Sequence, residues 1–145
     1  MKKCIYLLLF FVLLACSRQT PQEKIENLNG YWAISKVETK NGKTKEYPAF
    51  NSLVDYIEIN DNKGFRKKVK PKIDGSFLVT DDSEKIIVKV ENDNINLYYS
   101  TGLDEWKETL IASEENKIVL QNEEGIEYSY KRFTGYLNEH GKKKQ

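Results

Sequence analysis

Apolar and polar residues alternate with a period of two in short segments from Gly30 onward. The apolar positions are rich in Val, Ile, Tyr and Phe, and clusters of Asn, Asp, Gly and Glu separate one segment from the next. This pattern is typical of β-strands joined by turns, and no long helix fits between the segments. We expect strands near residues 31–39, 53–60, 64–70, 75–80, 85–91, 94–100, 105–112, 117–121 and 125–133.

The connections between these segments are short and hairpin-like, so consecutive strands should pair antiparallel. They include Asn41-Gly42, Asn62-Lys63-Gly64, Asp74-Gly75, Asn92-Asp93 and Glu123-Glu124-Gly125. A sheet of eight or nine strands with one apolar face is most stable when it closes into a barrel, because closure removes unpaired edges and creates a common interior. The sequence therefore predicts an all-β fold, an antiparallel meander barrel. An open sandwich is the alternative.

The alternation also predicts which residues face the barrel interior. In the segment near 85–91 the inward set is Ile86, Val88 and Val90, and in the segment near 94–100 it is Ile95, Leu97 and Tyr99. In the last segment Tyr128 and Tyr130 share a face with Arg132. An arginine is thus expected on the inward side of the last strand.

The first fifteen residues have a different character. Lys2 and Lys3 precede an uncharged apolar run over residues 5–15. A membrane-spanning helix needs about 20 apolar residues, whereas the apolar core of a secretory signal needs only about 7 to 15. We therefore expect residues 1–15 to be a signal peptide.

Leu13-Leu14-Ala15-Cys16 resembles the lipobox of bacterial lipoproteins. The resemblance implies cleavage between Ala15 and Cys16 and acyl groups, palmitate among them, on the Cys16 thiol. Two or more acyl chains hold a protein stably at a membrane, where a single chain is marginal. Ser17 stands where many bacteria use aspartate to mark inner-membrane retention, so the resemblance favours the outer membrane of the cell envelope. An ordinary secretory signal with a chance cysteine is the alternative.

Cleavage before Cys16 would leave a domain without a free thiol, because Cys4 departs with the signal and Cys16 carries lipid. Disulfides and cysteine-based metal sites or nucleophiles are then excluded. The chain has 23 Lys and Arg against 22 Asp and Glu, and cleavage removes Lys2 and Lys3. This near-neutral balance argues against a nucleic-acid partner.

Residues 16–29 are expected to form a lipidated tether with one short helix. Thr20-Pro21-Gln22-Glu23 has the form of a capping box with proline at the first helical position, and Gly30 can end the turn. Residues 30–134 then make up the barrel, and residues 135–145 form a basic C-terminal tail.

Gly30-Tyr31-Trp32 and Arg132 resemble the Gly-x-Trp motif and the closing arginine of the lipocalins. In that family the glycine permits a tight chain entry, and the arginine packs on a tryptophan that plugs one end of the barrel. The resemblance implies a structural role for Gly30, Trp32 and Arg132. It departs from the family in the helix that usually follows the barrel, which has no clear counterpart here.

Functional candidates are few. The aromatic residues Tyr99, Trp106, Tyr128 and Tyr130 could line a ligand cavity, and core packing is the alternative reading. A basic segment containing Lys63, Arg66, Lys67, Lys68, Lys70 and Lys72 reads as a solvated strand face, with contact to an anionic partner as the alternative.

Catalysis is poorly supported by the sequence. The single histidine, His140, sits in the tail beside Lys142 to Lys144, and paired carboxylates such as Asp81-Asp82 fall in turn-like segments. We expect no catalytic residue, no metal site and no cofactor. The sequence predicts a monomeric, membrane-tethered protein that binds a small apolar ligand. The alternative is an envelope interaction module, an inhibitor or assembly accessory, with a filled barrel.

Overall fold

The computed structural model describes residues 18–48 and 53–136 of the chain. In this part the chain begins with a short helix, α2 (Pro21–Glu26), which is followed by nine strands. The strands are β1 (Gly30–Glu38), β2 (Thr44–Glu46), β3 (Val54–Asn60), β4 (Lys63–Pro71), β5 (Phe77–Glu91), β6 (Asn94–Ser100), β7 (Glu105–Glu114), β8 (Lys117–Asn122) and β9 (Glu127–Arg132). No helix in residues 18–48 or 53–136 is long and apolar enough to cross a membrane.

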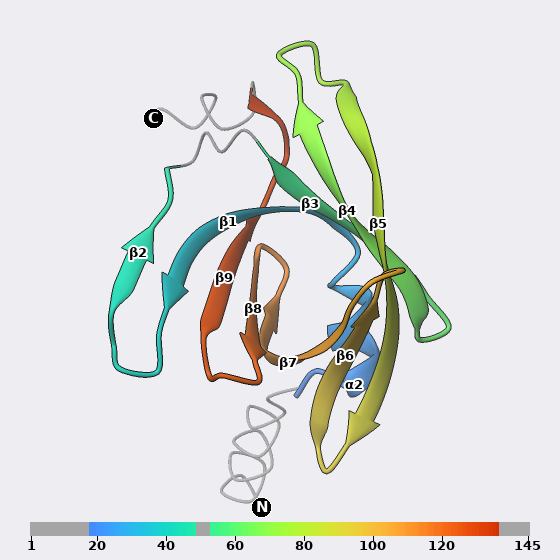
Figure 1. Ribbon diagram of the computed structural model, residues 1–145, viewed down its shortest axis with the longest axis vertical. Coiled ribbons are helices and arrows are strands. Elements are labelled where there is room, and N and C mark those ends of the chain that lie inside the picture. The colour runs from blue at the N-terminus through green and yellow to red at the C-terminus, as the bar shows by residue number, and fades with distance from the viewer. Residues whose placement is uncertain (1–17, 49–52, 137–145) are drawn as a thin grey trace, which may run out of the picture.

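The strands form an antiparallel meander that closes on itself (Figure 1). From β3 to β9 each strand pairs with the next, and β1 pairs with both β3 and β9. Trp32 stands opposite Asp55 on β3 and opposite Arg132 on β9, so β1 seals the barrel. The predicted meander barrel is confirmed.

Two details of the strand pattern differ from the prediction. The strands expected near 75–80 and 85–91 are one continuous strand, β5. Lys67 of β4 pairs with Ser83 of β5, and Val69 pairs with Val79. The polar residues between Val79 and Ser83 therefore include extra residues of β5, which form a bulge. Asp81 and Asp82 are therefore exposed strand residues rather than turn residues.

Strand β2 was not predicted. Its three residues are all polar and exposed, so they leave no trace in the apolar alternation. It pairs with the second half of β1 through the backbone, from Lys36 opposite Glu46 to Glu38 opposite Thr44.

The tight turns explain why the hairpins form where they do. Asp61 and Asn62 between β3 and β4, and Asn92 and Asp93 between β5 and β6, all have positive φ angles. Two central residues of this kind match the right-handed twist of the flanking strands, and Asn and Asp tolerate the conformation better than most residues. The turn predicted at Asn92-Asp93 is thus confirmed, whereas the turn predicted at Asn62-Lys63-Gly64 lies one residue earlier, at Asp61 and Asn62, and Lys63 and Gly64 already belong to β4.

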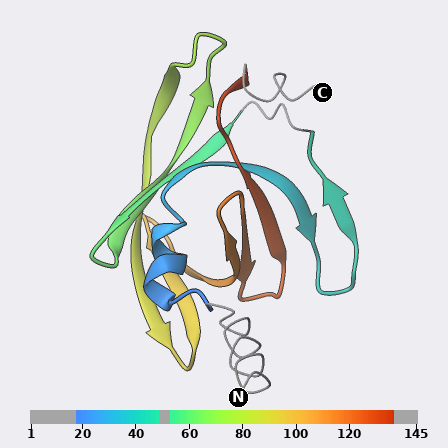
Figure 2. The same cartoon turned by 180° about the vertical axis from the view of Figure 1, so that it is seen from behind.

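One end of the barrel is filled by the main hydrophobic core. Ile25 and Leu28, from and just after helix α2, pack with Trp32 and with inward residues of the strands. Ile86, Val88, Ile95, Leu97 and Tyr99 are buried as the alternation predicted, whereas Val90 is exposed near the end of β5. Figure 2 shows α2 beside the start of β1. The predicted helix is confirmed, with Thr20 and Glu23 forming the capping box.

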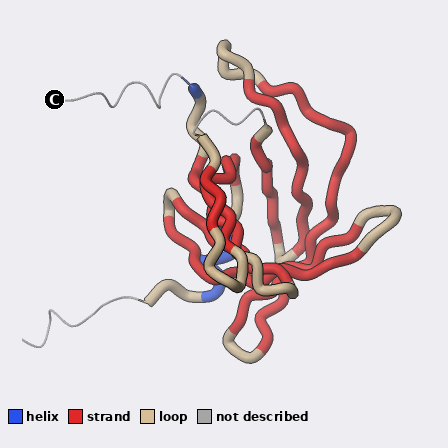
Figure 3. The backbone as a smooth tube through the Cα atoms, turned by 60° about the vertical axis from the view of Figure 1, so that its left-hand side comes forward, coloured by secondary structure: helices blue, strands red, loops and turns tan. Residues whose placement is uncertain are grey.

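The β4–β5 hairpin extends beyond the rest of the barrel (Figures 1 and 3). A second cluster packs at its base, on the outer side of β1 and β3, and it includes Val54, Val69 and Phe133. The Tyr31 and Phe77 rings stack there with centroids 4.3 Å apart. This cluster braces the hairpin without contributing to the barrel interior.

Candidate functional site

The closed end of the barrel is held together by Arg132. Its guanidinium carbon lies 4.2 Å from the centre of the Trp32 ring. Its nitrogens donate hydrogen bonds to the backbone carbonyls of Asn27 (2.9 Å), Asn29 (2.8 Å) and Glu115 (2.5 Å). The Trp32 indole donates to the carbonyl of Leu28 at 2.8 Å. These contacts connect the segment after helix α2 to the first strand of the barrel, β1, and to the last, β9.

Gly30 completes this arrangement. Its φ is +123°, a backbone conformation that other residues rarely adopt. A Cβ at this position would lie 2.6 Å from a terminal nitrogen of Arg132. Gly30, Trp32 and Arg132 therefore meet at one place, at the closed end of the barrel.

The four aromatic residues proposed from the sequence all lie on the interior side of the barrel and are called the aromatic cluster below. Tyr99 and Tyr130 are 1% and 6% exposed, and Trp106 and Tyr128 pack against the same core while remaining partly accessible. Tyr99 and Trp106 stack almost parallel, with centroids 5.2 Å apart and planes 7° apart. The structure thus brings together a stacked pair from β6 and β7 with two tyrosines from β9.

A cleft of about 330 Å³ opens beside the stacked pair. Tyr99 and Trp106 line it, whereas Tyr128 and Tyr130 do not. Ser100 and Glu105, which flank the β6–β7 turn, also line it, so the cleft lies at the end of the barrel opposite Trp32. We call this end the mouth. The remaining lining residues are Ile87, Tyr98, Lys107 and Glu123. Ile87, Tyr98 and Lys107 are paired with one another across the strands and alternate with the inward residues, so the cleft opens on the outer face of β5, β6 and β7 at the mouth.

A group of charged side chains in the interior was missed by the sequence analysis. Arg66 was assigned to a solvated strand face, but it is only 8% exposed, so that assignment is wrong for this residue. Its guanidinium lies over the ring of Tyr99, with the guanidinium carbon 4.4 Å from the ring centre. It pairs with Glu84 on β5 and with Glu108 on β7, the latter at 3.3 Å.

A second ion pair lies two residues further along β4. Asp55 on β3 is buried and pairs with the half-exposed Lys68 on β4, directly opposite. The charge cluster therefore comprises Arg66 and Lys68 with the three carboxylates Asp55, Glu84 and Glu108. Strand alternation could have revealed part of this cluster. Arg66 and Lys68 lie on the same face of β4 as Gly64, whereas Lys67 lies on the opposite face.

Electrostatics keeps the phenols of this region neutral. Burial raises the pKa of Tyr99 well above its usual 10, the Arg66 charge opposes the shift, and Glu108 adds to it. Burial also raises the pKa of Tyr130, with Asp55 adding to the effect, and that of Tyr128, with Glu108 adding. Burial lowers the pKa of Arg66, but Tyr99 and Glu108 outweigh burial and leave it above its usual value. Arg66 thus stays charged.

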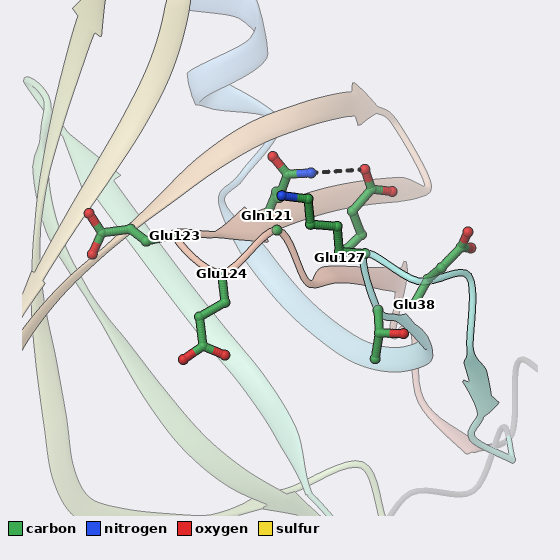
Figure 4. A pocket seen from close by; sticks show the side chains of 8 residues that line it. Glu38, Gln121, Glu123, Glu124 and Glu127 are labelled. Atoms are coloured by element: carbon green, nitrogen blue, oxygen red, sulfur yellow. Dashed lines mark hydrogen bonds between the residues drawn. The ribbon is translucent and has the colours of Figure 1, made fainter.

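A further cleft, of about 430 Å³, lies on the outer surface near the mouth (Figure 4). Its side chains come from β1, β8, β9 and the turns beside them, and they include Glu38, Glu123, Glu124 and Glu127. Gln121 donates a hydrogen bond to Glu127 at 3.2 Å. In the part of the chain that the structure describes, no group of three or more His, Cys, Asp or Glu residues is arranged to hold a metal ion.

Several residues singled out in the sequence cannot be placed. Ala15, Cys16 and the rest of the signal peptide, together with His140, lie outside the described residues.

Comparison with known proteins gives one family match. A lipocalin-like domain family matches residues 28–139. Searching curated proteins returned no match.

Solved structures with a similar fold include a lipocalin-like protein from Bacteroides uniformis, with 10% identity and a TM-score of 0.46 over 74% of this chain and 99% of that one. An uncharacterized protein from Bacteroides eggerthii has 14% identity and a TM-score of 0.46, over 73% of this chain and 99% of that one. Apocrustacyanin C1 has 12% identity and a TM-score of 0.47, over 86% of this chain and 69% of that one. At these scores the similarity adds nothing to the family match.

Proposed function

Because the chain belongs to the lipocalin-like domain family, we propose that it binds a small ligand with an apolar body at the barrel mouth. The observation that carries the proposal is the Tyr99–Trp106 stack on the interior side of the mouth, where Trp106 remains partly accessible. A stacked pair with one partly accessible member offers a flat apolar platform. Small-molecule sites typically combine such aromatic walls with a few convergent polar groups.

The two ends of the barrel support this placement. At the closed end Trp32 and Leu28 are fully buried and Arg132 covers the indole, so ligand entry there would require breaking the contacts that hold the fold. At the mouth Trp106 is only partly buried, and polar side chains converge a short distance inside it. A ligand would enter past Trp106.

The proposal includes the anchor. Cleavage after Ala15 and acylation of Cys16 would tether the domain to an envelope membrane, most simply the outer membrane, as a monomer. Residues 18–20 lead directly into helix α2 at the closed end. A short tether from Cys16 would then hold the closed end toward the membrane and leave the mouth facing away from it. We propose a binding role rather than a catalytic one.

Native mass spectrometry of the full protein extracted in detergent tests the binding role. We expect a fraction of the protein to carry a small molecule of defined mass. Replacing Trp106 with Leu should remove that molecule by deleting the platform. Leu103→Ala is the matched control, because Leu103 lies in the adjacent β6–β7 turn and is fully exposed.

Wild-type protein that stays free of ligand, and also fails to bind added aromatic probes, would contradict the proposal. So would full retention of the ligand by a folded Trp106→Leu variant.

A protein-interaction role is the second candidate, and the projecting β4–β5 hairpin favours it. Ile73, Leu78 and Val79 are 79%, 52% and 61% exposed on this hairpin. Exposed apolar groups of this kind mark contact sites when they are contiguous. Replacing Ile73 and Leu78 with Ser should abolish co-purification of a protein partner, if one exists, and leave small-molecule binding intact.

A further inference from the structure

Strand β5 is longer than the strand that pairs with it next. It covers Phe77–Glu91, but β6 pairs only with its second half, beginning with Lys85 opposite Ser100. The chain turns back after Ser100 to start β7. In the described part of the chain, no strand therefore pairs with residues 77–84 on the side away from β4. We call residues 77–84 the free edge, and Figure 1 shows this half of β5 extending with β4 past the end of β6.

The backbone of the free edge can accept a further strand. Successive residues of a β-strand direct their N–H and C=O groups alternately to its two sides, and β4 uses only one side here. Thr80 closes the bulge on that side by donating its hydroxyl to the carbonyl of Lys68 at 2.9 Å, and β5 remains one strand through the bulge. An edge of this kind is a template for an extended segment of another chain.

The side chains of the free edge leave it open. Edge strands are commonly protected by lysine, by proline or by a covering loop. The sequence of the free edge is Phe-Leu-Val-Thr-Asp-Asp-Ser-Glu, which contains neither lysine nor proline. Leu78 and Val79 are 52% and 61% exposed, so apolar surface borders the unpaired backbone. Pairing with another segment would bury part of this surface, which favours association.

Two acidic residues determine which segment fits. Asp81 and Asp82 are adjacent and exposed, and neither forms an ion pair within the residues that the structure describes. Lys68, which stands opposite the bulge on β4, already pairs with the buried Asp55. Opposite charges on neighbouring strands attract and like charges repel. A segment with lysine or arginine opposite the acidic pair is therefore favoured, and an acidic segment is opposed.

A second copy of the chain is a poor match for the free edge. Contact between the free edges of two copies is two-fold symmetric, so it brings the same acidic pair to the interface from both sides. The two pairs repel each other. The charge of the free edge thus points to a different polypeptide.

We propose that the free edge of β5 binds an extended segment of another protein, which adds to the sheet as a further strand and carries lysine or arginine opposite Asp81 and Asp82. Its apolar residues cover Leu78 and Val79. This inference rests on the protein-interaction role, the second candidate function, and names the chemistry of the partner. It does not depend on small-ligand binding, because no residue of the aromatic cluster belongs to the free edge.

Three synthetic octapeptides test the inference. The basic probe is Lys-Lys-Thr-Val-Val-Thr-Lys-Lys, and glutamine or glutamate replaces every lysine in the neutral and acidic probes. The sequence is symmetric, so it presents lysine to the acidic pair in either strand direction. Each probe is titrated into the full-length protein in a nonionic detergent at low salt, and the backbone amides are followed by nuclear magnetic resonance.

We expect the basic probe to bind about tenfold or more tightly than the acidic probe, with the neutral probe between them. Saturation with the basic probe should slow hydrogen exchange of the amides that the free edge donates to it by about tenfold or more, because the new strand takes them from water.

A basic probe with N-methyl groups on alternate backbone amides is the control for strand pairing. It keeps every side chain but loses N–H groups that a strand donates, so it should bind about tenfold or more weakly. Asp81→Asn with Asp82→Asn should remove the preference for the basic over the acidic probe. The matched control is Glu123→Gln with Glu124→Gln, which neutralises an adjacent exposed acidic pair between β8 and β9 and should keep that preference.

Equal binding of the basic and acidic probes, undiminished binding of the N-methylated probe, or failure of all probes to bind would overturn the inference. So would a dimer of the wild-type protein in which the free edge is already protected from exchange, because a second copy would then occupy it. If the probes fail while the Ile73 and Leu78 serine variant still loses a co-purifying protein, the inference is wrong and the interaction role stands.

Discussion

Replacing Arg132 with Ala should destabilise the fold by removing the contacts that tie the helix segment to the last strand. The variant loses hydrogen bonds to the carbonyls of Asn27, Asn29 and Glu115 and the packing on Trp32. Arg132 is partly exposed, so water replaces some of this interaction, and each hydrogen bond is worth about 0.5 to 1 kcal/mol. The contact with the indole adds about 0.5 to 1 kcal/mol.

The expected loss in the free energy of unfolding is therefore about 2 to 4 kcal/mol. For a domain of this size it lowers Tm by about 8 to 16 °C. Urea denaturation, monitored by the fluorescence of the buried Trp32, measures the loss in the free energy of unfolding. Arg132→Lys should fall between the wild type and the alanine variant, because lysine keeps the charge but not the planar fork that reaches several carbonyls.

Lys131→Ala is the control for this experiment, because Lys131 precedes Arg132 in β9 and its side chain is exposed on the opposite face of the strand. It should change the unfolding free energy by less than about 0.5 kcal/mol. An Arg132→Ala variant as stable as Lys131→Ala would show that the closed end is held by apolar packing alone.

Three further predictions concern the anchor, the helix and alkaline pH. Cys16→Ala should move a folded domain from the membrane to the soluble fraction, and its retention after a carbonate wash would contradict the anchoring proposal. Thr20→Ala should lower the unfolding free energy by about 0.5 to 2 kcal/mol in urea melts, because the Thr20 hydroxyl accepts the Glu23 N–H; an unchanged urea midpoint would show that packing of Ile25 and Leu28 is enough. The raised pKa values of Tyr99 and Tyr130 stabilise the fold below pH 10, the unfolded pKa, and that stability is lost as pH rises above it. Unfolding free energies measured from pH 8 to 11 should fall above pH 10, and less steeply in Tyr130→Phe; equal slopes would count against burial of the phenol.

The features that the sequence predicted correctly are local ones. The turn at Asn92-Asp93 depends on residues that tolerate positive φ, and the helix start depends on Thr20 and Glu23, three residues apart. Burial of Ile86, Leu97 and Tyr99 follows from strand alternation once the barrel closes. Each of these can be inferred without knowing which distant strands meet.

The features that were missed depend on distant partners. Strand β2 has no apolar residue, and only its pairing with β1 makes it a strand. Strand β5 continues through Asp81 and Asp82 because the bulge opposite Lys68 accommodates them. Arg66 is buried because Glu84 and Glu108, 18 and 42 residues away in the chain, meet it inside the barrel.

The position of the ligand at the mouth is tested most directly by the two tryptophans of the chain. Their indole N–H signals can be followed by nuclear magnetic resonance during a titration with benzyl alcohol, and Trp106→Phe assigns them. Trp106 borders the mouth cleft, whereas Trp32 is fully buried at the closed end with its N–H bonded to Leu28. We predict a saturable shift of the Trp106 signal with the Trp32 signal unchanged. A shift of Trp32 alone, or of neither signal, would contradict binding at the mouth.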